Sequence, residues 1–435
     1  MGRLAGRQRT EPMRQRTFLL LLSVLGVSGC AASMSGLYGG NEGGGNRPTM
    51  LAPNGGPSAA LAGGRPVVAI LAPMTGPRAD IGQVLVQAAQ LALPDASGPT
   101  LDVLDTTGTP AGAAAAAQSA IAHGDGMIIG PLTSDETASV TPIARSAGIP
   151  VLAFTNDGSK SQPGVWTLGI TPEQQVQRLV TAAQAQGKTQ FAALLPDNGL
   201  GHAMASALTT ATAQAGLQSP TIRTHGAGMP SITSAARDIS GYATRRGPID
   251  AKIKAARELH SAEGRKQAQE LSKTPIPPPP FDTLLLADTG ENLQEIAAVL
   301  PYYDVDRSAV QIVGPSLWAD PATGSAAVSG AWYAAPDSAA RSAFVQAYTA
   351  KYGVAPPTIA DLAFDAASVA RIAVGDQGGK QGILTEPGGF VGSDGWFTLG
   401  GDGHVRRGLA VFKVERGGPP EIVDPAPQSP SAAGM

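Results

Sequence analysis

The chain has 435 residues, with 31 lysines and arginines against 34 aspartates and glutamates, which gives a formal net charge of −3. Only 15% of its residues are charged, against an average of about 25%, which excludes nucleic-acid binding through bulk positive charge. The single cysteine, Cys30, excludes an intramolecular disulfide, a cysteine-based zinc site and a CxxC redox motif.

Residues 1–29 have the pattern of a secretory signal. Five arginines lie within residues 1–17, and the apolar run Phe18–Val27 follows. This run is too short to span a bilayer, which needs about 20 apolar residues, so a signal peptide is predicted. The run leads into Val27-Ser28-Gly29-Cys30, which resembles a bacterial lipoprotein signal and implies that Cys30 is acylated and anchors the chain to a membrane. The alternative is ordinary cleavage near Ala31.

Two segments, 30–66 and 417–435, are rich in Gly, Pro and Ser and have little apolar periodicity. Such composition is typical of disorder. The first is predicted to be a tether with an end-to-end distance of roughly 30–35 Å, and the second to be a disordered tail. The globular body is therefore predicted to occupy residues 67–416.

Within the body, short apolar runs alternate with helix-forming stretches, which is βαβ spacing. The predicted strands are 67–71, 101–104, 127–129, 151–154, 191–195, 283–287 and 310–313. The predicted helices include 83–93, 111–123, 136–147, 202–215 and 291–300. The body is too long for one sheet with one core, so the predicted fold class is α/β with two doubly wound parallel-sheet lobes.

Loops at the carboxyl ends of parallel strands are where such sheets bind ligands. Three of these loops carry hydroxyls or amides beside a helix start. Their candidate ligand-binding residues are Thr75, Thr133, Ser134, Thr155 and Asn156. Helix capping and turns need the same residue types, so a purely structural role is the alternative for each loop.

Taken together, four segments resemble the type I periplasmic-binding fold, specifically the leucine/isoleucine/valine-binding-protein family. They are VAILAPMTGPRADIG, GMIIGPLTSDETASVTPIARSAGIPVLAFTN, FAALLPDNGLGHAM, and VQIVGPSLWADP with the following GAWYAAPD. The resemblance implies two lobes with a central cleft, lobe one at 67–170 and 336–391 and lobe two at 171–335 and 392–416. It implies three chain crossings, near Gly169–Thr171, Tyr333–Pro336 and Gly392–Trp396.

The same resemblance implies positions that line the cleft. Thr133 and Ser134 match the first hydroxyl loop, and Ala153 with Thr155 the second. Ser316 stands where the family has an acid that pairs with a ligand ammonium, and an unpaired ammonium in a closed cleft costs several kcal/mol. Asp288 or Glu291 is a possible substitute. Other expected cleft residues are Ile81 and Leu200, which replace aromatic residues, together with Thr75, Asn156 and Trp318.

A subgroup called penicillin-binding-protein activators is similar in its lipoprotein signal, in LPYYDVD and GPSLWADP, and in a long insertion before Phe281. The insertion, 231–280, is predicted to be helical and ends in a polyproline segment. Residues 245–273 carry eight basic residues against four acidic ones. Such an arm is expected either to meet a partner enzyme or anionic cell-wall polymer, or to be a solvated helix.

Two functions are weighed. The first is a non-catalytic periplasmic lipoprotein that regulates peptidoglycan synthesis through a penicillin-binding protein or peptidoglycan itself. The second is the solute-binding component of an ABC importer for amino acids or related small molecules. No catalytic, cofactor or metal motif is found: the histidines are scattered without ligand spacing, so no enzyme, no cofactor and no metal are expected. Ala31 and Ala32 lack the aspartate that marks inner-membrane retention in enteric lipoproteins, which favours the outer membrane.

Overall fold

The computed structural model describes residues 48–51, 65–94, 98–375 and 380–429. The predicted signal peptide, the lipidation residue Cys30 and most of the predicted tether lie outside the described residues, so these remain predictions. In the part of the chain that the structure describes, the helices are all too short or too polar to cross a membrane.

The first sheet has five parallel strands in the order β3-β2-β4-β5-β6. Its strands are β2 (Val67–Ala72), β3 (Thr100–Asp105), β4 (Met127–Ile129), β5 (Val151–Ala153) and β6 (Val165–Thr167). Helices cover both faces, and side chains alternate between them: Val68 and Ile70 join one core, Ala69 and Leu71 the other. Burial on both faces explains why β2 reads as a continuous apolar run.

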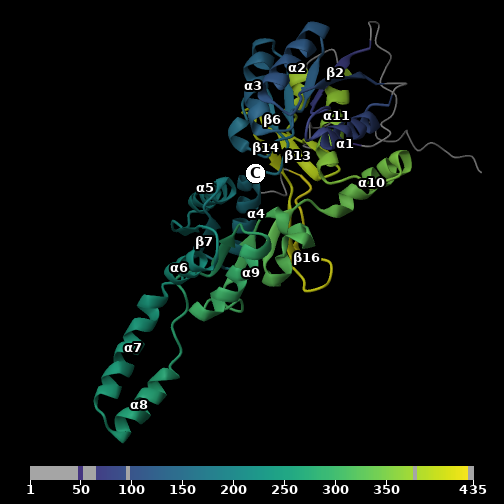
Figure 1. Ribbon diagram of the computed structural model, residues 1–435. Helices are drawn as coiled ribbons and strands as arrows, with labels where there is room; N and C mark the ends of the chain where they lie inside the picture. The colour runs from purple at the N-terminus through teal and green to yellow at the C-terminus, as the bar shows by residue number, and fades with distance from the viewer. Residues whose placement is uncertain (1–47, 52–64, 95–97, 376–379, 430–435) are drawn as a thin grey trace, which may run out of the picture. The chain divides into compact units, whose positions relative to one another are not determined.

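Two helices pack on each face of the first sheet (Figure 1). They are α1 (Ala79–Ala92) and α11 (Ile359–Gly375) on one face, and α2 (Pro110–His123) and α3 (Ser134–Ser146) on the other. Local sequence fixes their ends. Pro110 occupies the first turn of α2 and Gly124 ends it in the left-handed conformation, at φ 79°, which is the preferred placing of proline and glycine. Helix α10 (Ser338–Tyr352) contributes Phe344 and Tyr348 to the α1 and α11 core.

The second sheet has seven strands in the order β16-β15-β11-β10-β9-β7-β8. Its parallel strands are β7 (Phe191–Pro196), β8 (Thr221–His225), β9 (Thr283–Leu286), β10 (Gln311–Gly314) and β11 (Trp332–Ala335). Two antiparallel strands extend it, β15 (Ala410–Lys413) and β16 (Glu421–Asp424). One face is covered by α4 (Pro172–Ala185) and α5 (Gly199–Gln214), and the other by α6 (Met229–Ile239) and α9 (Gly290–Val299).

A third, small sheet has the order β1-β12-β13-β14. Its strands are β1 (Thr49–Met50), β12 (Phe390–Gly392), β13 (Gly395–Leu399) and β14 (Val405–Arg407). Phe390 and Phe397 pack into the same core as α1 and α11. Short elements complete the two lobes. They are α12 (Lys380–Leu384) and the 3₁₀ turns Gly158–Lys160, Leu300–Tyr303, Ser316–Ala319, Pro321–Thr323 and Ser325–Val328.

An α-helical hairpin is inserted between α6 and β9. It consists of α7 (Tyr242–Glu258) and α8 (Ala262–Ser272), which lie side by side in Figure 1. A small core of its own, which includes Ile253, Ala256 and Ala268, holds the two helices together. Arg245 ties the hairpin to the rest of the second-sheet region, because its guanidinium donates to the carbonyl oxygens of Ser240, Pro277 and Tyr303 at 2.6–2.8 Å.

The α/β class with two doubly wound sheets is confirmed, and the seven predicted strands all form. In both sheets the first strand along the chain, β2 or β7, lies between the second strand, β3 or β8, and the third strand, β4 or β9. The direction in which successive strands are added across the sheet therefore reverses between β2 and β4 in the first sheet and between β7 and β9 in the second, while the strands stay parallel. Such reversal points are where loops part and ligands bind.

Several predicted boundaries are wrong. The tail begins too early at 417, because β16 pairs with β15 and Arg178 binds Asp424 at 2.8 Å. The tether at 30–66 is interrupted at 49–50, where β1 pairs with β12. The assignment of 392–416 to lobe two fails for β13 and β14, which pack on the core of the first sheet, so the third crossing falls after β14 rather than at Gly392–Trp396. The insertion predicted at 231–280 starts after α6, because Ile232 and Ile239 belong to the core of the second sheet.

Candidate functional site

Polar side chains meet where β4 and β5 end. Thr133 caps α3: its Oγ1 accepts from the backbone N–H of Glu136 and donates to Oε2 of that residue at 2.7 Å. Ser134 Oγ donates to Oδ2 of Asp157, in the loop after β5, at 2.5 Å. Thr155 Oγ1 accepts from the backbone N–H of Asp157 at 3.1 Å. The hydroxyls expected to hold a ligand carboxylate are thus bonded within this chain.

Asp157 carries a negative charge into this loop cluster. Partial burial acts to raise the pKa of Asp157, but the hydrogen bonds from Ser134 and Ser159 outweigh it and hold the pKa below its ordinary value of 3.8. The group is therefore a carboxylate at neutral pH. An anionic ligand that approached the Ser134 hydroxyl would meet this like charge at close range.

The loop after β2 shows the same arrangement. Thr75 Oγ1 donates to Asp105 Oδ2 at 2.6 Å, and the backbone N–H of Met74 donates to Oδ1 at 2.9 Å. Burial acts against ionisation of Asp105, but these bonds lower its pKa. Ile81 is half-buried and packs on the core. Gly82 cannot be replaced freely, because a Cβ there would lie 2.1 Å from the carbonyl oxygen of Pro73.

At the reversal point of the second sheet a histidine and a carboxylate are sealed together. His225 Nε2 lies 3.1 Å from Asp288 Oδ2, and the two side chains are 1% and 2% exposed. His225 Nδ1 lies 2.9 Å from the carbonyl oxygen of Gly226. Both partners offer acceptor oxygens, so this arrangement favours the protonated imidazole, in which both ring nitrogens donate. Burial is the largest single influence and lowers the pKa of His225, but the bonds to Asp288 and Gly226 and the charge of Asp288 together outweigh it, and the pKa is raised.

Trp318 is bonded to the backbone of Asp288. Its Nε1 donates to the carbonyl oxygen of Asp288 at 3.0 Å, and the ring is 2% exposed. The ring occupies the space beside Gly314, where a Cβ would lie 2.3 Å from it. Ser316 is held through its backbone N–H, which donates to Gln175 Oε1 at 2.7 Å. Asp288 is therefore already paired and screened from solvent, and it is poorly placed to receive a ligand ammonium.

The other residues expected to line a cleft differ in burial. Ala153 is fully buried in β5 and Asn156 is exposed. Leu200 is half-buried and packs on the α4 and α5 side of the second sheet. Two hollows of about 460 and 300 Å³ occur in the described residues, one on the α7–α8 hairpin and one beside α3, and none of the predicted ligand residues lines either of them.

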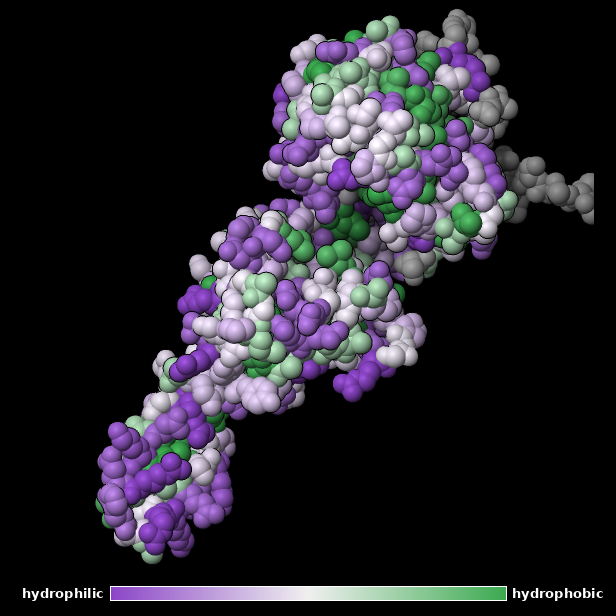
Figure 2. Space-filling view, in the orientation of Figure 1, coloured by the Kyte–Doolittle hydropathy of each residue, from purple (hydrophilic) through white to green (hydrophobic). Residues whose placement is uncertain are grey.

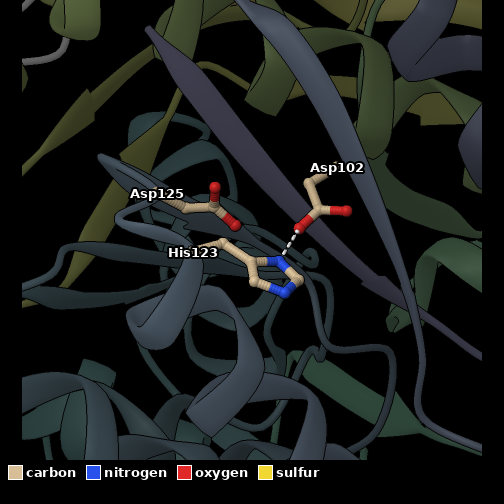
Figure 3. Close-up of side chains that lie close together, drawn as sticks. All are labelled: Asp102, His123 and Asp125. Atoms are coloured by element: carbon tan, nitrogen blue, oxygen red, sulfur yellow. Dashed lines mark hydrogen bonds and ion pairs between the residues drawn. The ribbon is translucent and has the colours of Figure 1, made fainter.

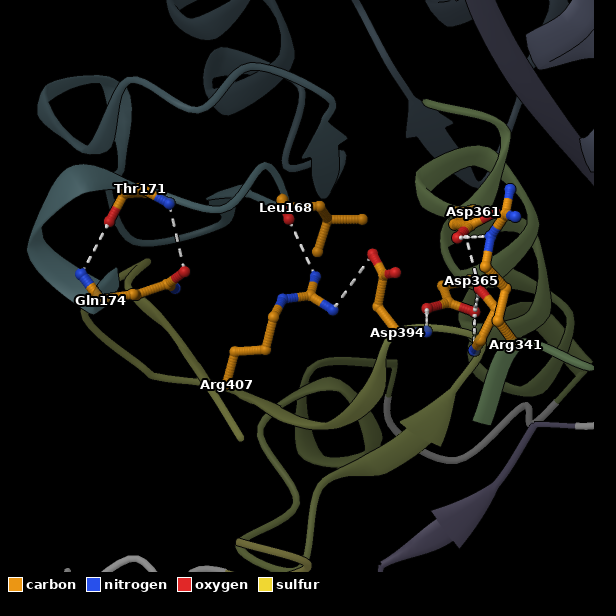
Figure 4. A network of polar contacts seen from close by, with 9 residues as sticks. Leu168, Thr171, Gln174, Arg341, Asp361, Asp365, Asp394 and Arg407 are labelled. Carbon is orange, nitrogen blue, oxygen red and sulfur yellow. Dashed lines mark hydrogen bonds and ion pairs between the residues drawn. The ribbon is translucent and has the colours of Figure 1, made fainter. Parts of the chain in front are cut away.

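The segments that pass between the two sheets are joined by polar contacts (Figure 4). Arg407 Nη2 donates to the carbonyl oxygen of Leu168 at 2.8 Å, and its Nη1 lies 3.7 Å from Asp394 Oδ2. Gln174 completes the cap of α4 with Thr171, and its Nε2 donates to the carbonyl oxygen of Val405 at 2.7 Å. Segments more than 200 residues apart in the sequence are therefore tied at the crossings.

Two more buried carboxylates belong to this network. Asp365 Oδ1 accepts from the backbone N–H and the hydroxyl of Ser393 at 2.7 and 2.9 Å. Asp361 Oδ2 accepts from Arg341 Nε at 2.6 Å. Burial, and then the charge of Asp394, raise the pKa of both Asp361 and Asp365. Asp361, Asp365 and Asp394 lie close together at the crossings, so the first two bind protons more tightly than free aspartates do.

The sequence directed attention to these loops but not to the hydrogen-bonded pairs within them. Asp157 lies in a loop already singled out, next to the chosen Asn156. Asp105, Gln175 and His225 were missed, since each acts through a partner on another element. Only an acid at the end of a predicted strand, as Asp105 ends β3, gives a signal that a sequence could carry.

Comparisons with known proteins place the chain among binding proteins. A family model described as periplasmic binding protein matches residues 67–381. The sequence finds no match among curated proteins. Similar solved structures include a putative branched-chain amino acid ABC transporter from Rhodospirillum rubrum, with 19% identity, coverage of 82% of this chain and 100% of that chain, and a TM-score of 0.61.

Two further solved structures are similar to this chain. The substrate-binding protein LivJ from Streptococcus pneumoniae, in complex with isoleucine, has 18% identity, covers 83% of this chain and 100% of its own, and has a TM-score of 0.51. Full-length LpoA from Haemophilus influenzae has 16% identity, with coverage of 82% of this chain and 59% of that chain, and a TM-score of 0.57. Likeness at these identities establishes the fold.

Proposed function

The chain belongs to the periplasmic binding protein family, and we propose that it is a non-catalytic, lipid-anchored member that binds a partner protein rather than a free amino acid. The proposed partner is a penicillin-binding protein, whose peptidoglycan synthesis it regulates from the outer membrane. Membership of the family by itself places the protein outside the cytoplasm.

One observation carries the proposal: the groups that would grip an amino acid are already engaged. Ser134 donates to the carboxylate of Asp157, so a ligand carboxylate would have to displace a like charge. Asp288 is 3% exposed and paired with His225, and Ser316 supplies no charge. Burying an ammonium without a counter-ion costs several kcal/mol, which disfavours a zwitterionic ligand.

The α7–α8 hairpin supports a protein partner. The hairpin has a small core of its own, separate from the cores of the two sheets. Figure 2 shows mostly hydrophilic side chains over it. Three ion pairs lie within it, Arg246–Asp250, Lys254–Glu258 and Lys273–Glu270, and they leave a surplus of positive charge among residues 245–273. An exposed cationic surface fits an acidic patch on a partner enzyme.

The resemblance to penicillin-binding-protein activators and the structural likeness to LpoA support the choice of partner. This chain spans 59% of LpoA, so the likeness concerns one part of that protein. The mode of activation is accordingly proposed only for contacts that this fold and its hairpin can make.

The test is binding of the purified chain to a purified class A penicillin-binding protein from the same cell, measured by interferometry. The charge-reversal variant Lys252→Glu, Arg265→Glu, Lys266→Glu changes three exposed cations of the hairpin. We expect at least tenfold weaker binding and a steep loss with added salt. The matched control reverses Arg237, Arg307 and Arg416, exposed cations outside the hairpin, and is expected to bind normally. Absence of binding by the unaltered chain, or binding only to isolated peptidoglycan, would contradict the proposed partner.

A second function, solute binding for an importer, is favoured by the similar structures named as amino acid transporters. It requires that Asp157 and the hydroxyls rearrange around a ligand. Calorimetric titration separates it from the first function, since only an importer component would bind an amino acid tightly.

A further inference from the structure

We propose that Asp102, His123 and Asp125 form a binding site for one divalent transition-metal ion of the zinc class. The three residues come from different elements: Asp102 lies on β3, His123 is the last residue of α2, and Asp125 lies in the turn before β4. Thr133 and Ser134 follow β4, whereas Asp125 precedes it. The proposed metal site is therefore separate from the loops of the candidate ligand site.

The geometry is close to that of a metal site. One ligand atom from each residue can be chosen so that all three lie within 4.8 Å of one another, and His123 Nδ1 lies 2.7 Å from Asp102 Oδ2. Ligand atoms around tetrahedral zinc, at bonds of about 2.1 Å, are about 3.4 Å apart. The 2.7 Å contact between His123 and Asp102 has to open slightly for both atoms to bind one ion. The His123 side chain is 55% exposed and can turn to do so.

An independent observation concerns Asp125. The residue is 3% exposed, and both of its carboxylate oxygens are buried without a hydrogen-bond partner among the described residues. Figure 3 shows the Asp125 carboxylate close to the carboxylate of Asp102 and to the ring of His123. A buried carboxylate with no donor is costly, and a second acid beside it adds repulsion. A cation bound between the two carboxylates removes both costs.

The donor set indicates the class of metal. One imidazole nitrogen with carboxylate oxygens suits zinc and its neighbours, whereas calcium and magnesium favour shells of oxygen alone. Three protein ligands leave a position for water or for a side chain of a partner. Because the ligands come from a strand, a helix end and a turn, the ion would clip these elements together and bind only the folded chain.

The test uses the full chain with its affinity tag removed and with Cys30→Ala throughout, so that no thiol competes for metal. Zinc chloride is titrated calorimetrically, and the stoichiometry is checked by native mass spectrometry. The variants are Asp125→Asn and His123→Gln. The matched control is His202→Gln, because His202 also pairs with an acid, Asp197, at 2.9 Å, but no third ligand in the described residues joins that pair.

We expect one zinc ion per chain, at least tenfold weaker binding in Asp125→Asn and in His123→Gln, and unchanged binding in His202→Gln. Zinc should raise the melting temperature of the parent and the control only, and equal calcium or magnesium should not displace it. No saturable zinc binding by the parent, or equal binding by all variants, overturns the proposal. If a variant fails to fold, X-ray absorption at the zinc edge of the parent complex decides: one histidine with oxygen ligands supports the site, and a shell of several histidines excludes it.

Discussion

The two sheets have the same strand order at their reversal points, yet the polar pairs in the loops on the same side of each sheet differ in how far they are exposed to solvent. In the first sheet, Asp157 and Ser134 form an open pair, and the Asp157 side chain is 36% exposed. In the second, His225 and Asp288 are sealed at 1% and 2% exposure, and Trp318 Nε1 donates to the carbonyl oxygen of Asp288. Solvent screens the open pair, while the sealed pair belongs to the core.

The largest expected effect comes from removing the Trp318 side chain, which is bonded to the backbone of the sealed pair. Trp318→Ala deletes a side chain that fills the space over Gly314, and we expect the free energy of unfolding to fall by about 3–5 kcal/mol. Urea denaturation measures this change. Leu317→Ala, at the exposed neighbour, is the control and should change stability by less than about 0.5 kcal/mol. Equal effects of the two substitutions would show that the second sheet is not sealed.

Next in size is the pair itself. Asp288→Ala leaves a buried N–H of His225 without an acceptor, which costs about 1–3 kcal/mol. Because the pKa of His225 is raised above 6.5, the pair's stabilisation is fully present below pH 6.5 and is lost as pH rises through the raised value. Unfolding measured from pH 5.5 to 9 should show this loss in the parent and not in the variant. Asp197→Ala, which breaks the exposed pair with His202, should leave stability almost unchanged.

The crossing network provides an intermediate case, buried like the second sheet but acidic. The pKa of Asp365 is raised from 3.8 by burial, so the folded chain holds a proton that the unfolded chain releases. Stability should therefore fall as pH rises from about 4 toward the raised value, by at most about 1.4 kcal/mol per pH unit for one proton. Asp365→Asn should flatten this slope in urea titrations. A slope that the substitution leaves unaltered would mean that Asp365 ionises normally.

The smallest effect is expected at the open pair. Ser134→Ala removes one bond to a partly exposed carboxylate, and we expect a loss of about 0.5 kcal/mol. Since the pKa of Asp157 is lowered, this contribution is present above pH 3.8 and disappears as pH falls through the lowered value. Thermal unfolding at pH 7 and at pH 3 measures it, with Ser139→Ala as a control on the same helix. A loss of several kcal/mol at pH 7 would place the open pair in the core and remove the contrast between the sheets.

Much of the fold could be predicted from the sequence, because the central strands are buried on both faces and appear as apolar runs. The strand β8 could not, since Thr221–His225 lies at the sheet edge with mostly exposed, polar side chains. The two-residue strand β1 has no pattern at all and depends on its partner β12. Segments late in the chain were hardest to place, because β13 and β15 lie ten residues apart and join different sheets.

The candidate sites were less predictable, because their chemistry lies in pairs. Ser134 and Asp157 are 23 residues apart, and His225 and Asp288 are 63 apart, so neither pairing has a sequence spacing. Asp102, His123 and Asp125 escaped notice for the same reason: histidines were compared with one another, whereas this histidine faces two acids from other elements.

The measurement that tests the central claim most directly is calorimetric titration of the chain with a panel of free amino acids that includes leucine, isoleucine and valine. With Asp157 beside the Ser134 hydroxyl and Asp288 held by His225, we predict no saturable heat at millimolar ligand. Saturation by any one amino acid with a micromolar Kd would show that these internal pairs give way to a ligand, and would make the chain a solute-binding protein.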